Sequence, residues 1–323
     1  GLIGGKAVGM LLARAILRHN DPAWQQRLEP HDSFFLGSDV FYTYLVQNGC
    51  WWVRERQRNP KNYLDGSVEA RRRILTGQFP DYLRAEFAHL LNYFGQSPII
   101  IRSSSLLEDS FGNAFAGKYE SYFLVNQGDP EVRYRQFEEA IRKVYASTMN
   151  EDALAYRLQR GLDQQDEQMA LLVQRVSGSY RKNYFFPDMA GVGVSYNTFV
   201  WNPEMDPKAG LIRLVFGLGT RAVDRVDDDY PQIIALDKPL LRPYADRQDV
   251  KKFSQHKVDL LNVTENKFES IDSLDILNED IDVPRDQIAT LDGETMRKMQ
   301  ELGIKNKKPW VLTFDNLLSN TEF

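Results

Sequence analysis

The chain has 323 residues and a mass of 37.3 kDa, enough for roughly two or three domains. A hydrophobic content of 42% and a charged content of 26% exclude wholesale disorder and are typical of a folded, soluble protein. The 40 Lys and Arg residues against 45 Asp and Glu give a net charge of −5. That balance excludes a surface built throughout to bind nucleic acid, and we expect no nucleic-acid partner, although a local basic cleft stays compatible.

Cysteine content and hydropathy indicate the compartment. The single cysteine, Cys50, excludes an internal disulfide, so we expect a reducing, cytoplasmic location. The sequence has no apolar run near the ~20 residues needed to cross a bilayer, and no secretory leader is visible. We therefore expect no membrane partner. The chain starts inside a glycine-rich turn, Gly1–Lys6, and we interpret it as a trimmed fragment of a longer protein.

The first half of the chain is predicted to be mainly helical. A first helix follows the glycines, and a second begins at Ser38 or Asp39, both good N-cap residues, and ends before Gly49. Residues 51–95 are charged and aromatic, with a basic amphipathic stretch at their end. The apolar residues that predict the first helix by their spacing are Val8, Leu11, Leu12, Ala15 and Ile16.

Strands and helices alternate after residue 98. The β-branched run 99–101 predicts a buried strand, and residues 120–125 predict its returning partner. Two helices are expected at about 130–147 and 150–160, before another strand at 169–176. This mixture predicts an α+β or α/β fold without internal repeats.

Two further strands, 190–200 and 211–219, contain glycines where backbones are expected to approach closely. Beyond Pro243 the composition shifts to short polar segments with alternating Val, Leu and Ile. We expect a separate, more solvated unit there.

Gly4-Gly5-Lys6 precedes the first helix. Unpaired N–H groups at a helix N-terminus attract phosphate, glycine allows close approach, and lysine adds a full positive charge. Ala7 stands where a Walker A loop has Ser or Thr, so the motif is not of that type. Alone, the motif is better explained by a glycine-rich turn with a solvated lysine.

A second motif follows the strand at 99–101. Arg102 and the hydroxyls of 103–105 come directly after the strand, before Glu108-Asp109 and the glycine-containing segment 111–117. Arginine can bind two phosphate oxygens at once, while loop hydroxyls and amides close over them. A hairpin whose serines cap a turn is the alternative interpretation.

A third motif combines cations and carboxylates at a strand end. Gly217-Leu218-Gly219-Thr220-Arg221 is followed by Asp224 and, after three consecutive aspartates, by Gln232. Carboxylates and carboxamides are oxygen ligands suited to magnesium, but a solvated acidic turn explains the aspartates equally well. The four histidines, at 19, 31, 89 and 256, have no metal-ligand spacing, and we interpret them and Cys50 as packing residues.

Taken in order, these motifs resemble the nucleotide-binding domain of the phosphoenolpyruvate synthase and pyruvate phosphate dikinase family. The resemblance spans about residues 4–240, and an ordered series is more specific than any one motif, so it favours the phosphate-binding interpretation of the first two motifs. The matching segments are Gly4-Gly5-Lys6, Ile101-Arg102-Ser103-Ser104, Glu108-Asp109, Ala114-Phe115-Ala116-Gly117, Glu120-Ser121-Tyr122, Val173-Gln174-Arg175-Val176 and Gly191-Val192-Gly193-Val194-Ser195.

The resemblance implies an α+β, ATP-grasp fold in which two α/β subdomains clasp ATP, with a C-terminal β-containing extension. We expect an N-terminal subdomain at 1–98, a subdomain with the phosphate-covering loop and metal-site strands at 99–240, and an extension or linker at 241–323. Further domains of the parent protein, a swivelling phosphohistidine domain and a pyruvate-binding domain, are the implied partners. A homodimer would form through regions outside this chain.

By the same resemblance, the chain would bind ATP and Mg²⁺ and carry out the first partial reaction of pyruvate phosphorylation. Lys6 and Arg102 are the predicted catalytic residues, because they would neutralise the triphosphate. Asp224 and Gln232 are the predicted metal ligands. The predicted ATP-binding residues are Lys6, Arg102, Ser103, Ser104, Gln174, Val176, Arg221 and Gln232.

One departure from the family pattern leaves alternatives open. Thr220 stands where the family commonly has a glutamate after Gly-Leu-Gly, and no histidine here lies in a Thr-Ser-His-Ala-like phosphoacceptor motif. A nucleotide-binding regulatory module without phosphoryl transfer is therefore a second hypothesis. A third keeps the phosphotransferase class but changes the acceptor, since related enzymes phosphorylate glucans or antibiotics.

Overall fold

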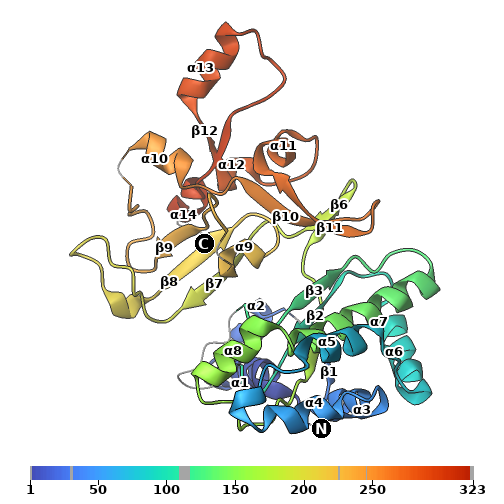
Figure 1. The fold of residues 1–323 in the computed structure, drawn as a ribbon. Helices are drawn as coiled ribbons and strands as arrows, with labels where there is room; N and C mark the ends of the chain where they lie inside the picture. Colours follow the sequence, from blue (N-terminus) through green and yellow to red (C-terminus); the bar gives the residue numbers. More distant parts are fainter. Residues whose placement is uncertain (1, 30–31, 109–116, 225, 245, 321–323) are drawn as a thin grey trace. The chain divides into compact units, whose positions relative to one another are not determined.

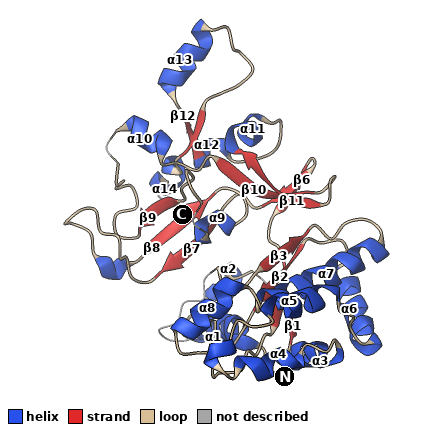
Figure 2. Cartoon of the chain, in the orientation of Figure 1, coloured by secondary structure: helices blue, strands red, loops and turns tan. Residues whose placement is uncertain are grey.

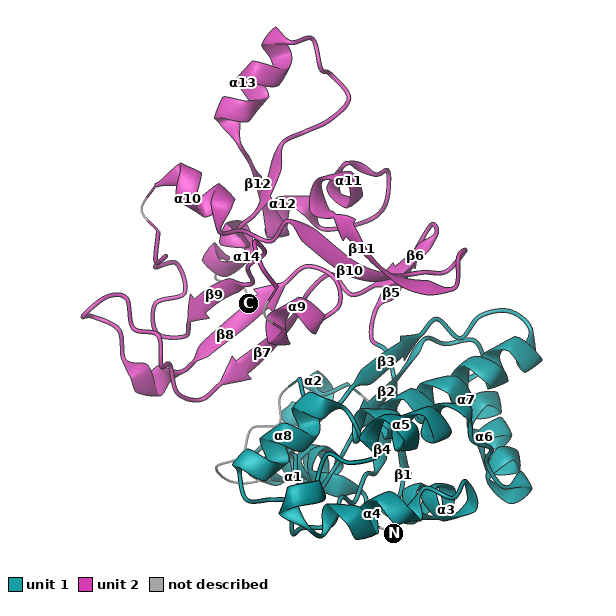
Figure 3. Ribbon diagram, in the orientation of Figure 1, with its two compact units in different colours: residues 1–176 teal, residues 177–323 magenta. Residues whose placement is uncertain are grey.

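A computed structural model describes residues 2–29, 32–108, 117–224, 226–244 and 246–320 (Figure 1). The chain divides into two compact units, residues 1–176 and 177–323, which Figure 3 shows in two colours. Helices and strands occur in both (Figure 2), so the predicted α+β class is confirmed. In the described ranges, no helix combines the length and the apolar character that crossing a bilayer requires.

Unit 1, residues 1–176, contains a four-stranded antiparallel sheet. Its order is β1 (Ser33–Leu36), β4 (Leu171–Arg175), β2 (Ile99–Ser103) and β3 (Ser121–Leu124). β3 returns antiparallel along β2, which confirms the predicted strand pair. β-branched Ile99 and Ile101 are fully buried, as expected for an inner strand with one face toward the core.

The helices of unit 1 include all four that the sequence predicts. The core packs α7 against β2 and β3, and α7 starts with Pro130 after an Asp129 cap that accepts the Glu131 and Val132 N–H groups. The bounds are α1 (Gly4–Asn20), α2 (Trp24–Arg27), α3 (Ser38–Gln47), α4 (Trp51–Gln57), η1 (Pro60–Asn62), α5 (Ser67–Thr76), α6 (Asp81–Phe94), α7 (Pro130–Ser147) and α8 (Glu151–Gln159).

The start of α3 differs from the prediction. Gly37 is the N-cap, so Ser38 is the first helical residue and neither it nor Asp39 caps the helix. The reason is a tertiary contact, because the Ser38 hydroxyl accepts the N–H of Leu2 at 3.3 Å and the Ser38 N–H donates to the Leu2 carbonyl at 2.9 Å. These bonds fix the segment that leads into α1.

The described residues of unit 2, which spans 177–323, form three sheets. The first has the order β11, β10, β6, β5, the second β7, β8, β9, and β12 pairs with β13. The two predicted strands at 190–200 and 211–219 are present as β7 and β8, in antiparallel pairing. The bounds are β5 (Ser179–Arg181), β6 (Tyr184–Phe186), β7 (Ala190–Val194), β8 (Leu211–Val215), β9 (Gln232–Ala235), β10 (Lys257–Asn262), β11 (Lys267–Asp272), β12 (Ala289–Leu291) and β13 (Trp310–Leu312).

Residues 241–323 share a sheet and a core with residues 177–240. β10 pairs with β6, and Val258 and Leu260 of β10 are buried in one cluster with Phe186 and Phe216. The division of the chain into segments of different roles stays a prediction. The helices of this unit are η2 (Pro207–Ala209), α9 (Thr220–Val223), α10 (Arg247–Lys252), α11 (Ser273–Asn278), α12 (Arg285–Ile288), α13 (Gly293–Glu301) and α14 (Asp315–Ser319).

Candidate functional site

The first two sequence motifs are in direct contact in unit 1. The turn that opens α1 lies on the loop that follows β2. The Gly5 N–H donates to the Ser105 carbonyl at 3.1 Å, and the Ser104 hydroxyl donates to the Ile3 carbonyl at 2.8 Å. The same hydroxyl accepts the N–H of Ala7 at 3.1 Å. One serine therefore satisfies polar backbone groups at the start of α1, which has no side-chain cap of its own.

Two glycines make this contact sterically allowed. Gly4 has a φ of +78°, and a Cβ on it would lie 1.4 Å from the Ser104 carbonyl oxygen. A Cβ on Gly5 would lie 2.5 Å from the Glu108 carbonyl oxygen. Both glycines are therefore required by the close approach of the protein's own loop.

Lys6 is held at the centre of this contact. Its Nζ lies 2.5 Å from Glu108 Oε1 and 3.3 Å from the Ser103 hydroxyl. The Lys6 side chain is 24% exposed, whereas that of Glu108 is 3% exposed. An ammonium group has three donors, and these two described partners take two of them. The geometry thus leaves Lys6 able to donate to an anion at the surface.

Glu108 organises the loop from within. Its Oε1 also accepts the Ser103 hydroxyl at 2.8 Å, and its Oε2 accepts the Ser105 N–H at 2.9 Å. Sequence reasoning placed Glu108 in the motif but gave it no role. Its position three residues after Ser105 was the available signal, since a glutamate at that spacing can accept the N–H of the earlier serine, as in a capping box. Residues 109–116, which include Asp109 and most of the glycine-containing segment 111–117, lie outside the described residues.

Arg102 and Gln174 lie on the neighbouring strands β2 and β4. The Arg102 Nη1 donates to Gln174 Oε1 at 3.4 Å, and the Gln174 amide donates to the Ser33 hydroxyl of β1 at 3.2 Å. Both side chains are half-buried. Val176, just beyond β4, donates its N–H to the Pro98 carbonyl at 2.9 Å. The structure thus brings Arg102 and Gln174 together, and Lys6 together with Ser103 and Ser104.

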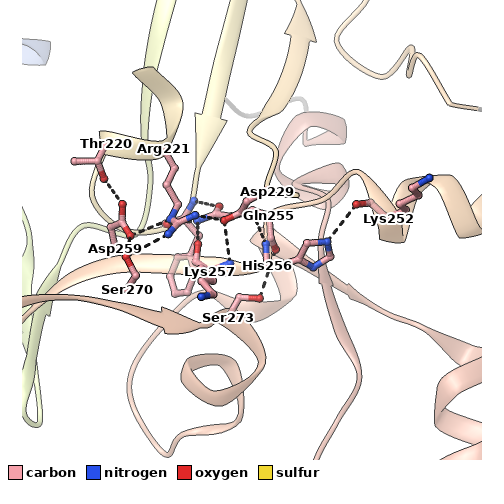
Figure 4. Close-up of polar contacts among 11 residues, drawn as sticks. Thr220, Arg221, Asp229, Lys252, Gln255, His256, Lys257, Asp259, Ser270 and Ser273 are labelled. Atoms are coloured by element: carbon pink, nitrogen blue, oxygen red, sulfur yellow. Dashed lines mark hydrogen bonds and ion pairs between the residues drawn. The ribbon is translucent and has the colours of Figure 1, made fainter. Parts of the chain in front are cut away.

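The third motif lies in unit 2, where Arg221 of α9 is buried between two carboxylates (Figure 4). Its Nε lies 2.9 Å from Asp259 Oδ1, and its Nη1 forms an ion pair with Asp229. Its Nη2 donates to the Ser270 hydroxyl at 3.2 Å. All three guanidinium nitrogens of this predicted ATP-binding residue therefore have protein partners.

Thr220, at the departure from the family pattern, belongs to the same cluster. Its hydroxyl donates to Asp259 Oδ2 at 2.5 Å, while Ser270 donates to Oδ1 of the same carboxylate at 2.5 Å (Figure 4). Sequence reasoning missed Asp259, although a carboxylate inside the apolar run 258–261 was a signal. A buried charge of this kind is stable only with partners, and here three donors supply them.

Asp229 links the cluster to β10. Its carboxylate accepts the backbone N–H groups of His256 at 2.6 Å and Lys257 at 3.3 Å. The Gln255 side chain accepts the N–H of Phe216 and donates to its carbonyl, both at 2.8 Å. The Gln255 contacts fix the turn between β8 and α9 at the start of β10, and the Asp229 contacts fix the segment between α9 and β9 at the same place, so Asp229 has a structural role.

The two predicted metal ligands, Asp224 and Gln232, differ in their exposure to solvent. Asp224 is exposed at the end of α9, where its N–H donates to the Thr220 carbonyl at 2.8 Å. Gln232 begins β9 and is half-buried. In the ranges that the structure describes, no group of three or more His, Cys, Asp or Glu side chains could hold a metal ion. A Mg²⁺ ion carried mainly by phosphates and water needs only one or two protein ligands, so the assignment of Asp224 and Gln232 stays a prediction.

Cys50 is buried in the core, and burial raises the pKa of its thiol. A thiol in that state is a poor nucleophile, which agrees with its interpretation as a packing residue.

Comparison with known proteins adds to this geometry. A "Probable phosphoenolpyruvate synthase" of Archaeoglobus fulgidus is 30% identical over 125 residues, 39% of this chain and 14% of that protein. A "Phosphoenolpyruvate synthase" of Aeropyrum pernix is 28% identical over 198 residues, 57% of this chain and 22% of its own length. A "Rifampicin phosphotransferase" of Bacillus cereus is 26% identical over 186 residues, 57% of this chain and 19% of that protein. The chain thus spans less than a quarter of the length of these relatives.

A family model gives the broadest match. The family described as "Pyruvate phosphate dikinase, AMP/ATP-binding domain" matches residues 1–307. Its domain has an ATP-grasp-type nucleotide-binding fold, which confirms the fold that the resemblance implied. With a match over nearly the whole sequence, the chain belongs to the pyruvate phosphate dikinase AMP/ATP-binding domain family.

Proposed function

We propose that this chain is the ATP-binding part of a phosphoenolpyruvate synthase-like phosphotransferase. In that role it transfers phosphate from ATP to a histidine on a separate domain, for the phosphorylation of pyruvate. The observation that carries the proposal is the contact between the turn of Lys6 and the loop of Ser103–Ser105, about a hundred residues away in sequence. Both motifs are suited to binding phosphate, and they meet at the partly exposed ammonium group of Lys6.

The reaction would depend on charge and position. Lys6 and Arg102 would neutralise triphosphate oxygens, and the hydroxyls and amides of Ser103 and Ser104 would orient them. Each charged contact contributes about 1.5–3 kcal/mol. Mg²⁺ bound with the nucleotide would supply further neutralisation of the phosphates. Asp224 and Gln232 would be its protein ligands, while Gln174 and Val176 would lie beside the adenine.

Arg221 and Gln232 are also proposed to contact ATP. For Arg221 this role has a structural cost, because its guanidinium already binds Asp229 and Asp259. A phosphate oxygen would have to share or displace one of these carboxylates. Among the residues proposed to bind ATP, Arg221 is therefore the one whose role the geometry supports least.

The other proposals concern the parent protein. We propose a cytoplasmic enzyme in which a swivelling phosphohistidine domain and a pyruvate-binding domain accompany this chain, with dimerisation through regions outside it. The proposed roles of residues 1–98, 99–240 and 241–323 are the N-terminal subdomain, the subdomain of the phosphate loop and metal-site strands, and the extension. Relatives described as rifampicin phosphotransferases support an alternative in which the final acceptor is not pyruvate.

Titration calorimetry of Arg102→Ala with ATP and Mg²⁺ tests the site. We expect binding to weaken at least tenfold, consistent with the loss of one charged contact of about 1.5–3 kcal/mol, while the thermal transition stays cooperative. Arg135→Ala is the matched control, because Arg135 is exposed on α7 of the same unit. If Arg102→Ala binds ATP as tightly as Arg135→Ala, Arg102 is not part of the site.

A second candidate function is a nucleotide-binding module without phosphoryl transfer. Thr220 favours this function, because it stands where the family commonly has a glutamate. Its hydroxyl donates to the Asp259 carboxylate. The two functions are separated by mixing the chain with the histidine domain of its parent and γ-labelled ATP. Labelled phosphohistidine supports the phosphotransferase, whereas tight ATP binding without label transfer supports the regulatory module.

A further inference from the structure

A buried carboxylate, Glu167, lies behind the loop that contacts Lys6. Its side chain is 1% exposed, and its Oε1 accepts the Ser105 hydroxyl at 2.5 Å. Its Oε2 accepts the Tyr119 hydroxyl and lies 3.7 Å from the Nη1 of Arg157. Glu167, Tyr119 and Arg157 all lie outside the sequence motifs that point to ATP.

The carboxylate is fixed by buried partners. Arg157 is also 1% exposed, and its Nη2 donates to the Gln165 carbonyl at 2.7 Å, two residues before Glu167. Burial, together with the Glu167 charge, raises the pKa of the Tyr119 hydroxyl well above its ordinary range, so the phenol stays protonated and donates. Charge and hydrogen bonding thus hold Glu167 in one position.

Ser105 transmits that position to the surface. Its hydroxyl faces Glu167, while its N–H donates to Glu108 and its carbonyl accepts the N–H of Gly5. Glu108 in turn binds Lys6. A continuous series of contacts therefore leads from the buried carboxylate to the proposed phosphate-binding cation.

The same carboxylate ties two strands together. Ser105 lies just beyond the end of β2, and Tyr119 lies just before the start of β3. Because both donate to Glu167, the carboxylate fixes the spacing of the two chain segments at this end of the strand pair. A carboxylate that only neutralised Arg157 would not need either of these donors.

We propose that Glu167 is a positioning residue for ATP binding, acting through Ser105 on Glu108 and Lys6. It would not touch the nucleotide. The proposal rests on the proposed ATP site, and it adds to that site a buried anchor. Outer-layer residues that orient ligand-binding groups have measurable effects on affinity although they make no ligand contact.

The test compares Glu167→Gln with Glu138→Gln. Glu138 is also a buried carboxylate of unit 1 that accepts a tyrosine hydroxyl, from Tyr134, and pairs with an arginine, Arg142. It has no contact with the loop among its described partners. Both variants should lower the melting temperature, but only Glu167→Gln should weaken ATP binding by calorimetry, about tenfold. Equal ATP affinities in the two folded variants would overturn the proposal.

Ser105→Ala provides a milder variant in case Glu167→Gln does not fold. We expect Ser105→Ala to weaken ATP binding several-fold, and the Glu167→Gln, Ser105→Ala double variant to be no weaker than Glu167→Gln alone. Additive losses would contradict transmission through Ser105.

Amide hydrogen exchange tests the anchor without ATP. The Gly5 and Ser105 amides should exchange at least tenfold faster in Glu167→Gln, or in Ser105→Ala, than in wild type and Glu138→Gln. Unchanged exchange at these amides would overturn the anchor even if ATP binds. If these amides exchange faster in Glu167→Gln but the wild-type chain binds no ATP, the anchor stands and the proposed function is refuted.

Discussion

Lys6 and Glu108 form an ion pair of 2.5 Å across 102 positions of sequence. The pair joins the glycine turn before α1 to the serine loop after β2. Because Glu108 is buried and Lys6 is partly exposed, the pair holds a cation at the surface in a fixed place. Pre-arranged charge of this kind lowers the cost of ordering side chains when an anion binds.

The glycines of this contact give the first prediction. Gly4→Ala should lower the free energy of unfolding by at least about 2 kcal/mol, because a Cβ meets the Ser104 carbonyl and the backbone has a φ of +78°. Gly9→Ala in the same helix is the control, since its Cβ meets no atom within 4 Å, and it should stabilise by up to about 1 kcal/mol. Urea denaturation measures both, and equal effects would contradict the close approach.

The buried ion-pair cluster around Arg221 in unit 2 gives the second prediction. Arg221→Met leaves the carboxylates of Asp229 and Asp259 buried without their cation, so the free energy of unfolding should fall by about 3–5 kcal/mol. Arg247→Met, an exposed arginine of α10, is the control and should have little effect. A loss for Arg221→Met no larger than that of the control would show that the cluster is not structural.

The cap of α13 gives a pH prediction. Hydrogen bonding from Thr295, followed by that from Lys251, lowers the pKa of Asp292 to about 2. The folded pKa lies below the unfolded value of about 3.9, so this stabilisation is complete above pH ~4 and is lost as the pH falls toward 2. Asp292→Asn should therefore lose less stability than wild type between pH 5 and 2.

Denaturation curves at a series of pH values measure this effect. Asp280→Asn is the control, because Asp280 is exposed in the same unit, and it should follow the wild-type curve. Acid curves that coincide for wild type and Asp292→Asn would contradict the assignment.

Local pattern predicted the secondary structure near the site well. The β-branched run at Ile99 and Ile101 predicted β2, and the β-rich run at 120–125 predicted its partner β3. Strand period and burial are properties of a few neighbouring residues, so they can be read from sequence. Ser38 shows the limit, because its hydroxyl binds Leu2 and does not cap its own helix.

The partners of the candidate site were not predictable in this way. Glu108 stood in the motif, but its contact with Lys6 depends on how α1 and β2 pack. Glu167 and Asp259 lie in or beside apolar runs, and only the fold shows which donors reach them. Likewise, the pairing of β10 with β6 joins segments about 75 residues apart, so composition alone suggested a separate unit.

The most direct test of the account is ATP titration by calorimetry of wild type, Lys6→Met and the control Lys61→Met. Lys61 is an exposed lysine of the same unit. We predict that wild type and Lys61→Met bind ATP with equal affinity, and that Lys6→Met, still folded, binds at least tenfold more weakly. Equal affinity for all three proteins, or no ATP binding by wild type, would contradict it.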